Sequence, residues 1–160
     1  MTTWQVFTDE VPEFAARAEA RLRAFTHLTM ATIRADGSPR ISGNEIRFKN
    51  GQAFLAGMLL ARRWEDLRRD PRVAIHSGSA SADEPTTWAG DAKVSGLARE
   101  VTDPEELATF AGSEKQIPPG PFALFAIEPT EVTCIGLTSA ADAMVIETWK
   151  PGQALTRYQR

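Results

Sequence analysis

The spacing of apolar residues divides the chain into a helical N-terminal segment and a longer region of short strands. Over residues 9–25, apolar side chains recur every three or four positions, so they share one face of a helix and leave charged residues around the rest. Pro12 then falls in the first turn, where its missing N–H breaks no helical hydrogen bond. After Thr26, short alternating stretches separated by turn residues predict β-strands.

Turn-forming dipeptides mark the first strands of this region. Asp36-Gly37 and Asn50-Gly51 favour two-residue hairpin turns, and together they predict a three-strand meander. On the second strand, Arg47 alternates with Glu45 and Lys49 and is expected to face solvent. The expected strands cover residues 28–34, 41–49, 52–56, 73–76, 92–101, 122–127, 131–135 and 144–149.

Two further helices are expected among these strands. Leu60, Trp64 and Leu67 share one face of a short helix. Asp103 followed by Pro104 is a helix start, with a capping side chain and then proline at the first helical position. Segments 77–90 and 117–121 are expected to be loops. Many short strands with only three helices predict a mainly-β fold, a barrel with helices packed outside.

Composition narrows the class of protein. The 160 residues are 42% hydrophobic and 24% charged, which is ordinary for one globular domain. A net charge of −3 argues against a nucleic-acid binder. A single cysteine, Cys134, excludes an internal disulfide and a cysteine metal cluster. No apolar run is as long as a membrane-spanning helix, and the N-terminus lacks the basic and then apolar pattern of a signal peptide. A cytoplasmic protein without membrane contact is therefore expected.

Residues 61–73, A-R-R-W-E-D-L-R-R-D-P-R-V, carry the clearest candidate chemistry. Arg62 and Arg63 open a short helix directly after a strand. Two guanidinium groups there match a phosphate, because backbone N–H groups at a helix start add positive charge. Taken alone, an arginine pair on an amphipathic helix is more often a solvated face. The arginines one or two turns later are expected to be solvated or structural: Arg68, Arg69 and Arg72.

This segment resembles the phosphate-binding segment of the pyridoxamine 5′-phosphate oxidase-like, FMN-binding split-barrel family. The family pattern is a strand, then Ser-Arg-Lys, then a helix ending in Asn-Pro-Arg-Val or Asp-Pro-Arg-Val. Arg62 stands at the family's arginine, Arg63 at its lysine, and residues 70–73 close the motif. Ala61 stands where the family often has serine, so one hydroxyl ligand for phosphate is missing.

The resemblance implies a split β-barrel of six or more antiparallel strands in Greek-key or meander order, with two or three peripheral helices. Residues 1–160 would be a single flavin-binding domain, with a helix over residues 9–25, a barrel core over 27–149 and a polar tail over 150–160. The family further implies a homodimer that encloses FMN in a groove between subunits.

Several residues are implied to hold the cofactor. Arg62 and Arg63 would bind its phosphate, the second strand would run along the flavin ring, and the residues before the phosphate helix would pack on the ring or ribityl chain. The candidates are Arg62, Arg63, Ser42, Gly43, Asn44, Ile46, Met58, Leu59 and Lys93. Purely structural roles stay open for these residues. Ser42, Gly43 and Asn44 could form an irregular edge strand, Met58 and Leu59 could be core or loop residues, and Lys93 could lie on an ordinary barrel strand.

The implied activity is that of a flavin-dependent oxidoreductase, which transfers a hydride to or from an unidentified small molecule. No protein nucleophile or general base stands out, which suits chemistry carried by the cofactor, so the catalytic residues stay unknown; no metal site is expected. One alternative is a reductase that depends on the 8-hydroxy-5-deazaflavin coenzyme. The phosphate-bearing tail of this coenzyme would bind to the arginine cluster. A second is a non-catalytic flavin- or haem-binding protein, with His76 as a candidate axial ligand. A third is a split barrel whose cofactor site is closed.

Overall fold

The computed structural model describes residues 2–78, 87–114 and 120–160, so parts of the expected loops 77–90 and 117–121 lie outside the described residues. The described residues form four helices and nine strands. In chain order they are α1 (Trp4–Glu10), α2 (Pro12–Arg23), β1 (Leu28–Ile33), β2 (Pro39–Asn44), β3 (Ile46–Lys49), β4 (Gln52–Met58), α3 (Arg62–Arg69), β5 (Arg72–His76), β6 (Asp91–Glu100), α4 (Pro104–Gly112), β7 (Phe122–Leu137), β8 (Met144–Trp149) and β9 (Thr156–Gln159).

The N-terminal helical segment consists of two helices where the sequence predicted one over residues 9–25. The side chain of Thr3 caps α1 by accepting a hydrogen bond from the backbone N–H of Val6. The chain then breaks at Val11, whose backbone angles are not helical, and α2 begins at Pro12. A residue before proline is disfavoured in the helical region, which accounts for the break. Pro12 does occupy a first turn, as predicted.

All paired strands are antiparallel, in the order β2-β1-β5-β6-β7-β4-β3, with β8 and β9 extending the sheet from β7. β2 and β3 stand at opposite ends of this order, yet only Glu45 separates them in the chain. The chain therefore crosses at Glu45 from one edge strand of the sheet, β2, to the other, β3. This crossing completes the barrel, and the described strands do not form a closed ring of hydrogen bonds. The prediction of a mainly-β split barrel with outer helices is confirmed.

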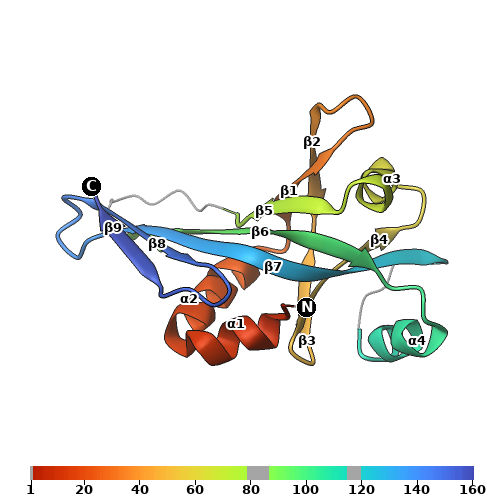
Figure 1. The fold of residues 1–160 in the computed structure, drawn as a ribbon, viewed down its shortest axis with the longest axis horizontal. Helices are drawn as coiled ribbons and strands as arrows, with labels where there is room; N and C mark the ends of the chain where they lie inside the picture. The colour runs from red at the N-terminus through yellow and green to blue at the C-terminus, as the bar shows by residue number, and fades with distance from the viewer. Residues whose placement is uncertain (1, 79–86, 115–119) are drawn as a thin grey trace.

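Two predicted strand divisions are wrong, and one strand was not predicted. The expected strand 41–49 is divided between β2 and β3, and the expected strands 122–127 and 131–135 are one strand, β7. The polar tail contains β9, which pairs with β8. β6 and β7 run along the length of the molecule, and α3 and α4 lie toward one end of it (Figure 1).

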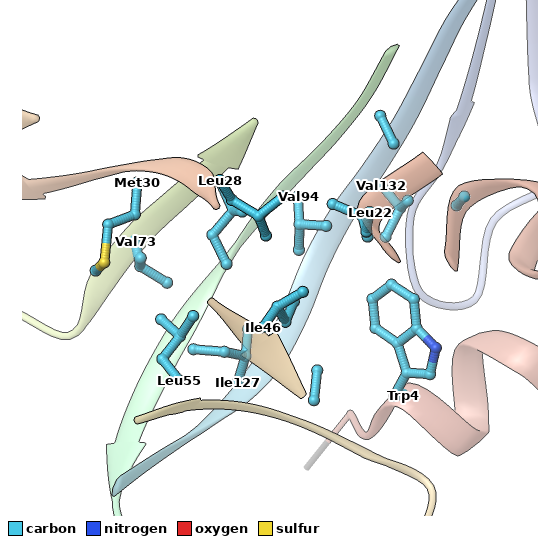
Figure 2. Packing of buried hydrophobic residues seen from close by; sticks show 14 of the residues in the cluster. Trp4, Leu22, Leu28, Met30, Ile46, Leu55, Val73, Val94, Ile127 and Val132 are labelled. Atoms are coloured by element: carbon cyan, nitrogen blue, oxygen red, sulfur yellow. The ribbon is translucent and has the colours of Figure 1, made fainter. Parts of the chain in front are cut away.

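The main core lies between the sheet and the two N-terminal helices. Trp4 and Leu22 from the helices meet strand residues such as Val132, and Leu55 and Ile127 continue the same apolar layer (Figure 2). A smaller cluster of Phe54, Val101, Phe110, Leu124 and Ala126 lies where α4 packs on β4 and β7. None of the helices in residues 2–78, 87–114 and 120–160 is long and apolar enough to span a bilayer.

α3 is held against the end of β4 by its apolar face. Trp64 and Leu67 are buried, and the Trp64 ring stacks on Phe125 with centroids 5.1 Å apart. The indole N–H of Trp64 donates to the carbonyl of Met58, at the end of β4, over 2.9 Å. These contacts place the start of α3, with its two arginines, beside the last residues of β4.

Candidate functional site

A cavity of about 360 Å³ lies where the crossover from β2 to β3, the end of β4, α3 and α4 meet. It brings together four of the residues predicted to hold a cofactor: Gly43, Asn44, Met58 and Arg63. The remaining lining residues are His27, Glu45, Arg47, Ala56, Gly57, Phe110, Glu114 and Phe122.

Arg63 enters the cavity over the backbone of β4. A Cβ added to Gly57 would lie 2.8 Å from its Nη2, so the glycine provides the space that the guanidinium occupies. The guanidinium also lies 4.6 Å from the Trp64 ring centroid. Its Nε is buried without a hydrogen-bond partner, and the described residues supply no carboxylate for it. Burial lowers the pKa of Arg63, because no anion compensates the desolvated charge.

The other arginines of the segment are paired with carboxylates. Arg62, whose side chain is 77% exposed, reaches Glu65 at 3.2 Å. Arg72 binds Asp70 so closely that it lowers the pKa of that carboxyl to about 2. The remaining two pairs are Arg68 with Glu100 and Arg69 with Asp66. The prediction that Arg68, Arg69 and Arg72 are solvated or structural agrees with these pairs, and Arg63 differs from all of them.

Asn44 provides a second unpaired donor. It is the last residue of β2 and only 6% exposed, and its Nδ2 is buried without a hydrogen-bond partner. Buried amide groups normally have partners, so such a donor is expected to meet a ligand or water. Gly43 beside it has open space where a side chain would project. Two residues that line the cavity, Arg63 and Asn44, thus carry buried donors, one of them charged, for which the described residues supply no acceptor.

An ion-pair network forms another part of the wall. Glu114, just after α4, accepts hydrogen bonds from Arg47 Nε at 3.0 Å and from Lys49 Nζ at 2.5 Å. Burial opposes ionisation of Glu114, but these two bonds outweigh it and lower its pKa. Arg47 also donates to Glu45, and the His27 ring lies 3.7 Å from the same carboxylate.

The position of Arg47 corrects the expectation that it faces solvent. Its side chain is partly buried, with 28% exposed, lies between Glu45 and Glu114 and lines the cavity. Alternation along the strand could not show this, because the covering residue Glu114 is 67 positions away in the chain. Phe110, Glu114 and Phe122 carry no local sequence signal of a site. They line it only because α4 folds back over β4 and β7.

The other predicted cofactor residues lie outside the cavity lining. Ser42 is half-buried on β2, and Ile46 is buried in the main core. Arg62 and Leu59 are exposed and are chain neighbours of the lining residues Arg63 and Met58, and Lys93 is exposed on β6 opposite His76. Their roles stay predictions, since a bound cofactor or a second subunit would change what they contact.

His76, the candidate haem ligand, also lies outside the cavity. Its Nδ1 is 2.6 Å from the carbonyl oxygen of Ser77, and its Nε2 is 3.8 Å from Asp91. Among the described residues, no group of three or more His, Cys, Asp or Glu side chains is suited to a metal ion. Among the described residues, the cavity lining has one cation and one amide without partners, together with the apolar surfaces of Ala56, Phe110 and Phe122, which suits an anionic ligand with a large apolar part.

Comparisons with known proteins agree with the family resemblance of residues 61–73. Residues 14–135 match the family model described as pyridoxamine 5′-phosphate oxidase. The search of curated proteins gave no match.

Similar solved structures share the fold at low sequence identity. A pyridoxamine 5′-phosphate oxidase-related, FMN binding protein from Nostoc punctiforme is 14% identical with a TM-score of 0.62, over 92% of this chain and 95% of that one. A heme binding protein from Mycobacterium smegmatis is 20% identical with a TM-score of 0.56; the match covers 89% of this chain but only 57% of that protein. An F420 reductase is 20% identical with a TM-score of 0.52, over 71% and 94%.

Proposed function

The chain belongs to the pyridoxamine 5′-phosphate oxidase family, and we propose that it is a flavin-dependent oxidoreductase that binds FMN in the cavity between β2, β4 and α3. The observation that carries the proposal is the pair of buried, unpartnered donors, Arg63 Nε and Asn44 Nδ2. Leaving such groups without partners costs about 1–3 kcal/mol each. A ligand with acceptor oxygens at both positions would recover that cost on binding.

Arg63 is the proposed phosphate ligand. Arg63 lies at the start of α3, and the described residues do not neutralise its charge. Its guanidinium occupies the space beside Gly57 of β4, where a side chain would otherwise project. The first backbone N–H groups of α3 have no side-chain cap, because the residue before the helix is Ala61. The Trp64 N–H already donates to the carbonyl of Ala61, so a phosphate bound there would receive the charged donor together with the first two backbone N–H groups of the helix.

The rest of the cavity orients the remainder of the ligand. Asn44 offers an amide donor to a polar edge, and Ala56, Phe110 and Phe122 offer apolar surface that keeps water away from a ring. The bound flavin would supply the hydride chemistry. The Glu114 carboxylate fixes Arg47 and Lys49, so these cations stabilise the wall and do not compete with Arg63 for the phosphate.

The charge pairing favours FMN over a deazaflavin coenzyme with a long anionic tail. Such a tail calls for several available cations, whereas Arg62, Arg68 and Arg69 each have a carboxylate partner here. In the described part of the chain, Arg63 is the one arginine of residues 61–73 without a carboxylate partner, which suits a single phosphate. The similar F420 reductase structure keeps the deazaflavin as the alternative to test. Haem is less well supported, because His76 lies outside the cavity and is bonded to the backbone of Ser77.

A second copy of the chain is the proposed cover of the site. Three consecutive apolar residues at the end of β4 and just after it are exposed, and the first of them lines the cavity: Met58 at 69%, Leu59 at 38% and Leu60 at 91%. Apolar side chains gathered at one exposed loop mark an interaction surface. In a homodimer this loop would meet the partner subunit, and a small-molecule substrate would enter between the two.

The test of the proposal is a comparison of FMN with riboflavin, which has the same ring but no phosphate. Protein stripped of bound ligands is titrated with each, following flavin fluorescence, and then with the deazaflavin coenzyme by absorbance. A charged contact to phosphate predicts FMN binding at least about tenfold tighter than riboflavin. Equal affinities for FMN and riboflavin would show that Arg63 does not bind the phosphate. If neither flavin binds, the proposal is rejected.

A kinetic measurement distinguishes an enzyme from a non-catalytic flavin carrier. The FMN-loaded protein is mixed with a nicotinamide donor and then with a quinone acceptor, while the flavin absorbance is recorded. Repeated bleaching and recovery is expected of an oxidoreductase. A flavin that neither partner reduces or reoxidises would favour the carrier.

A further inference from the structure

A buried carboxylate joins α3 to the first two strands of the sheet. Asp66 lies one turn after Arg63 on α3 and is only 3% exposed. Its Oδ2 accepts hydrogen bonds from the hydroxyl of Thr32 on β1 at 2.8 Å and from Nε of Arg40 on β2 at 2.6 Å. Burial opposes its ionisation, but the bonds from Arg40 and Thr32 outweigh that effect and lower the pKa of Asp66.

The two donors come from directly opposed positions of the sheet. Thr32 and Arg40 are partners in the β1–β2 register, so both point toward the same oxygen from adjacent strands. On the helix side, Arg69 adds a contact to Asp66 and donates to the carbonyl of Ile33 on β1. Asp66 is therefore a fixed point between α3 and the β1–β2 hairpin.

The same two elements carry the unpartnered donors of the cavity. Arg63 and Asp66 are three residues apart on α3 and are neighbours on the helix surface. Arg40 and Asn44 are four residues apart on β2, so their side chains point to the same side of the strand. The Asp66–Arg40 hydrogen bond thus joins α3 to β2. A ligand that contacts both Arg63 and Asn44 would bridge the same two elements.

We infer that Asp66 is a positioning residue for the ligand site: through Arg40 it sets the separation of α3 from β2, and so of Arg63 from Asn44. This inference rests on the proposed function. The apolar contacts of Trp64 and Leu67 hold the helix on the sheet, but apolar packing has little directionality. A hydrogen-bonded carboxylate has a defined direction and length, so it fixes where along the strands the helix sits.

The test uses Asp66→Asn, Arg40→Gln and the double variant, with Asp70→Asn as the matched control. Asp70 is in the same segment and also pairs with an arginine, Arg72, but at the surface. For each protein the FMN Kd is measured well below its melting temperature, so that loss of stability alone does not change the result. Amide hydrogen exchange of residues 62–69 is measured without ligand.

We expect Asp66→Asn and Arg40→Gln each to raise the FMN Kd about tenfold, as is typical when a supporting contact of a site is lost. The double variant adds little to either change, because both remove the same bond. Exchange of residues 62–69 rises in these variants, and Asp70→Asn changes neither quantity. If Asp66→Asn does not fold, Arg40→Gln tests the bond from the partly exposed partner.

Two results would separate the possible failures. Wild-type affinity in folded Asp66→Asn or Arg40→Gln would overturn the positioning role while leaving FMN binding in place. A wild-type protein that binds no FMN would remove the proposed function. The exchange measurement would then still decide whether Asp66 fixes α3: unchanged exchange overturns the inference, and increased exchange limited to residues 62–69 supports it.

Discussion

Replacing Arg63 with methionine should weaken FMN binding without weakening the fold. In the ligand-free protein the change removes the contact with the Trp64 ring, worth about 0.5–1 kcal/mol at such sites. It also removes a buried donor without a partner, which costs about 1–3 kcal/mol. The two effects oppose each other, so the ligand-free variant should be at least as stable as wild type.

The FMN complex loses its charged donor to phosphate. A hydrogen bond to a charged group contributes about 1.5–3 kcal/mol, and each ~1.4 kcal/mol is tenfold in Kd. The Arg63→Met variant should therefore bind FMN about 10- to 150-fold more weakly, while its affinity for riboflavin stays near that of wild type. Flavin fluorescence titration gives the affinities, and thermal unfolding followed by circular dichroism gives the stability.

Arg62→Met is the matched control, because it removes the same charge one residue earlier. Arg62 is exposed and paired with Glu65, so its loss should change the FMN Kd by no more than about twofold through screened charge effects. Two results would contradict a phosphate-binding role of Arg63: wild-type FMN affinity in Arg63→Met, or equal weakening in both variants. The second would show that general positive charge, and not the buried guanidinium, attracts the ligand.

Three further predictions concern the same cavity. Asn44→Ala should raise the FMN Kd about tenfold by removing an amide donor, with riboflavin weakened equally if the amide meets the ring; titration with both flavins checks this. Gly57→Ala should displace the Arg63 guanidinium, whose Nη2 would lie 2.8 Å from the new Cβ, and so weaken FMN binding with a stability loss of about 1–3 kcal/mol, measured by urea unfolding. The folded-state pKa of Glu114 is lowered, so its ionised form stabilises the fold above the ordinary carboxyl pKa of about 4.3, and this contribution is lost as pH falls through the lower folded value. Melting temperatures of Glu114→Gln and wild type should therefore differ most above about pH 5 and converge in acid, and a constant difference would contradict the assignment.

Local patterns were sufficient to predict the class of fold and the segment that carries the site. The two hairpin dipeptides, the short alternating stretches and the motif at residues 61–73 are all local signals. The break between β2 and β3 was not predicted, because it depends on the chain leaving one sheet edge for the other at Glu45. The irregular run Ser42-Gly43-Asn44 just before it was the only local sign of that change.

The difference between Arg62 and Arg63 could not be read from their spacing. Both open the same helix, and which one faces the cavity depends on how Trp64 docks against Phe125 and Met58. Gly57 is a hint only in retrospect, since a glycine within a strand often marks a close approach of another group. Asp66 was similarly hidden: the burial of this acid is explained by Thr32 and Arg40, which lie 34 and 26 positions away in the chain.

The most direct test of the central claim is the absorbance spectrum of the purified protein, with mass identification of the chromophore that heat releases. A flavin spectrum is expected, or its appearance when FMN is added to protein isolated without ligand, with FMN as the released compound. A Soret band would contradict it and point to haem. A colourless protein that takes up neither FMN nor the deazaflavin would also contradict it, leaving a split barrel without the proposed cofactor.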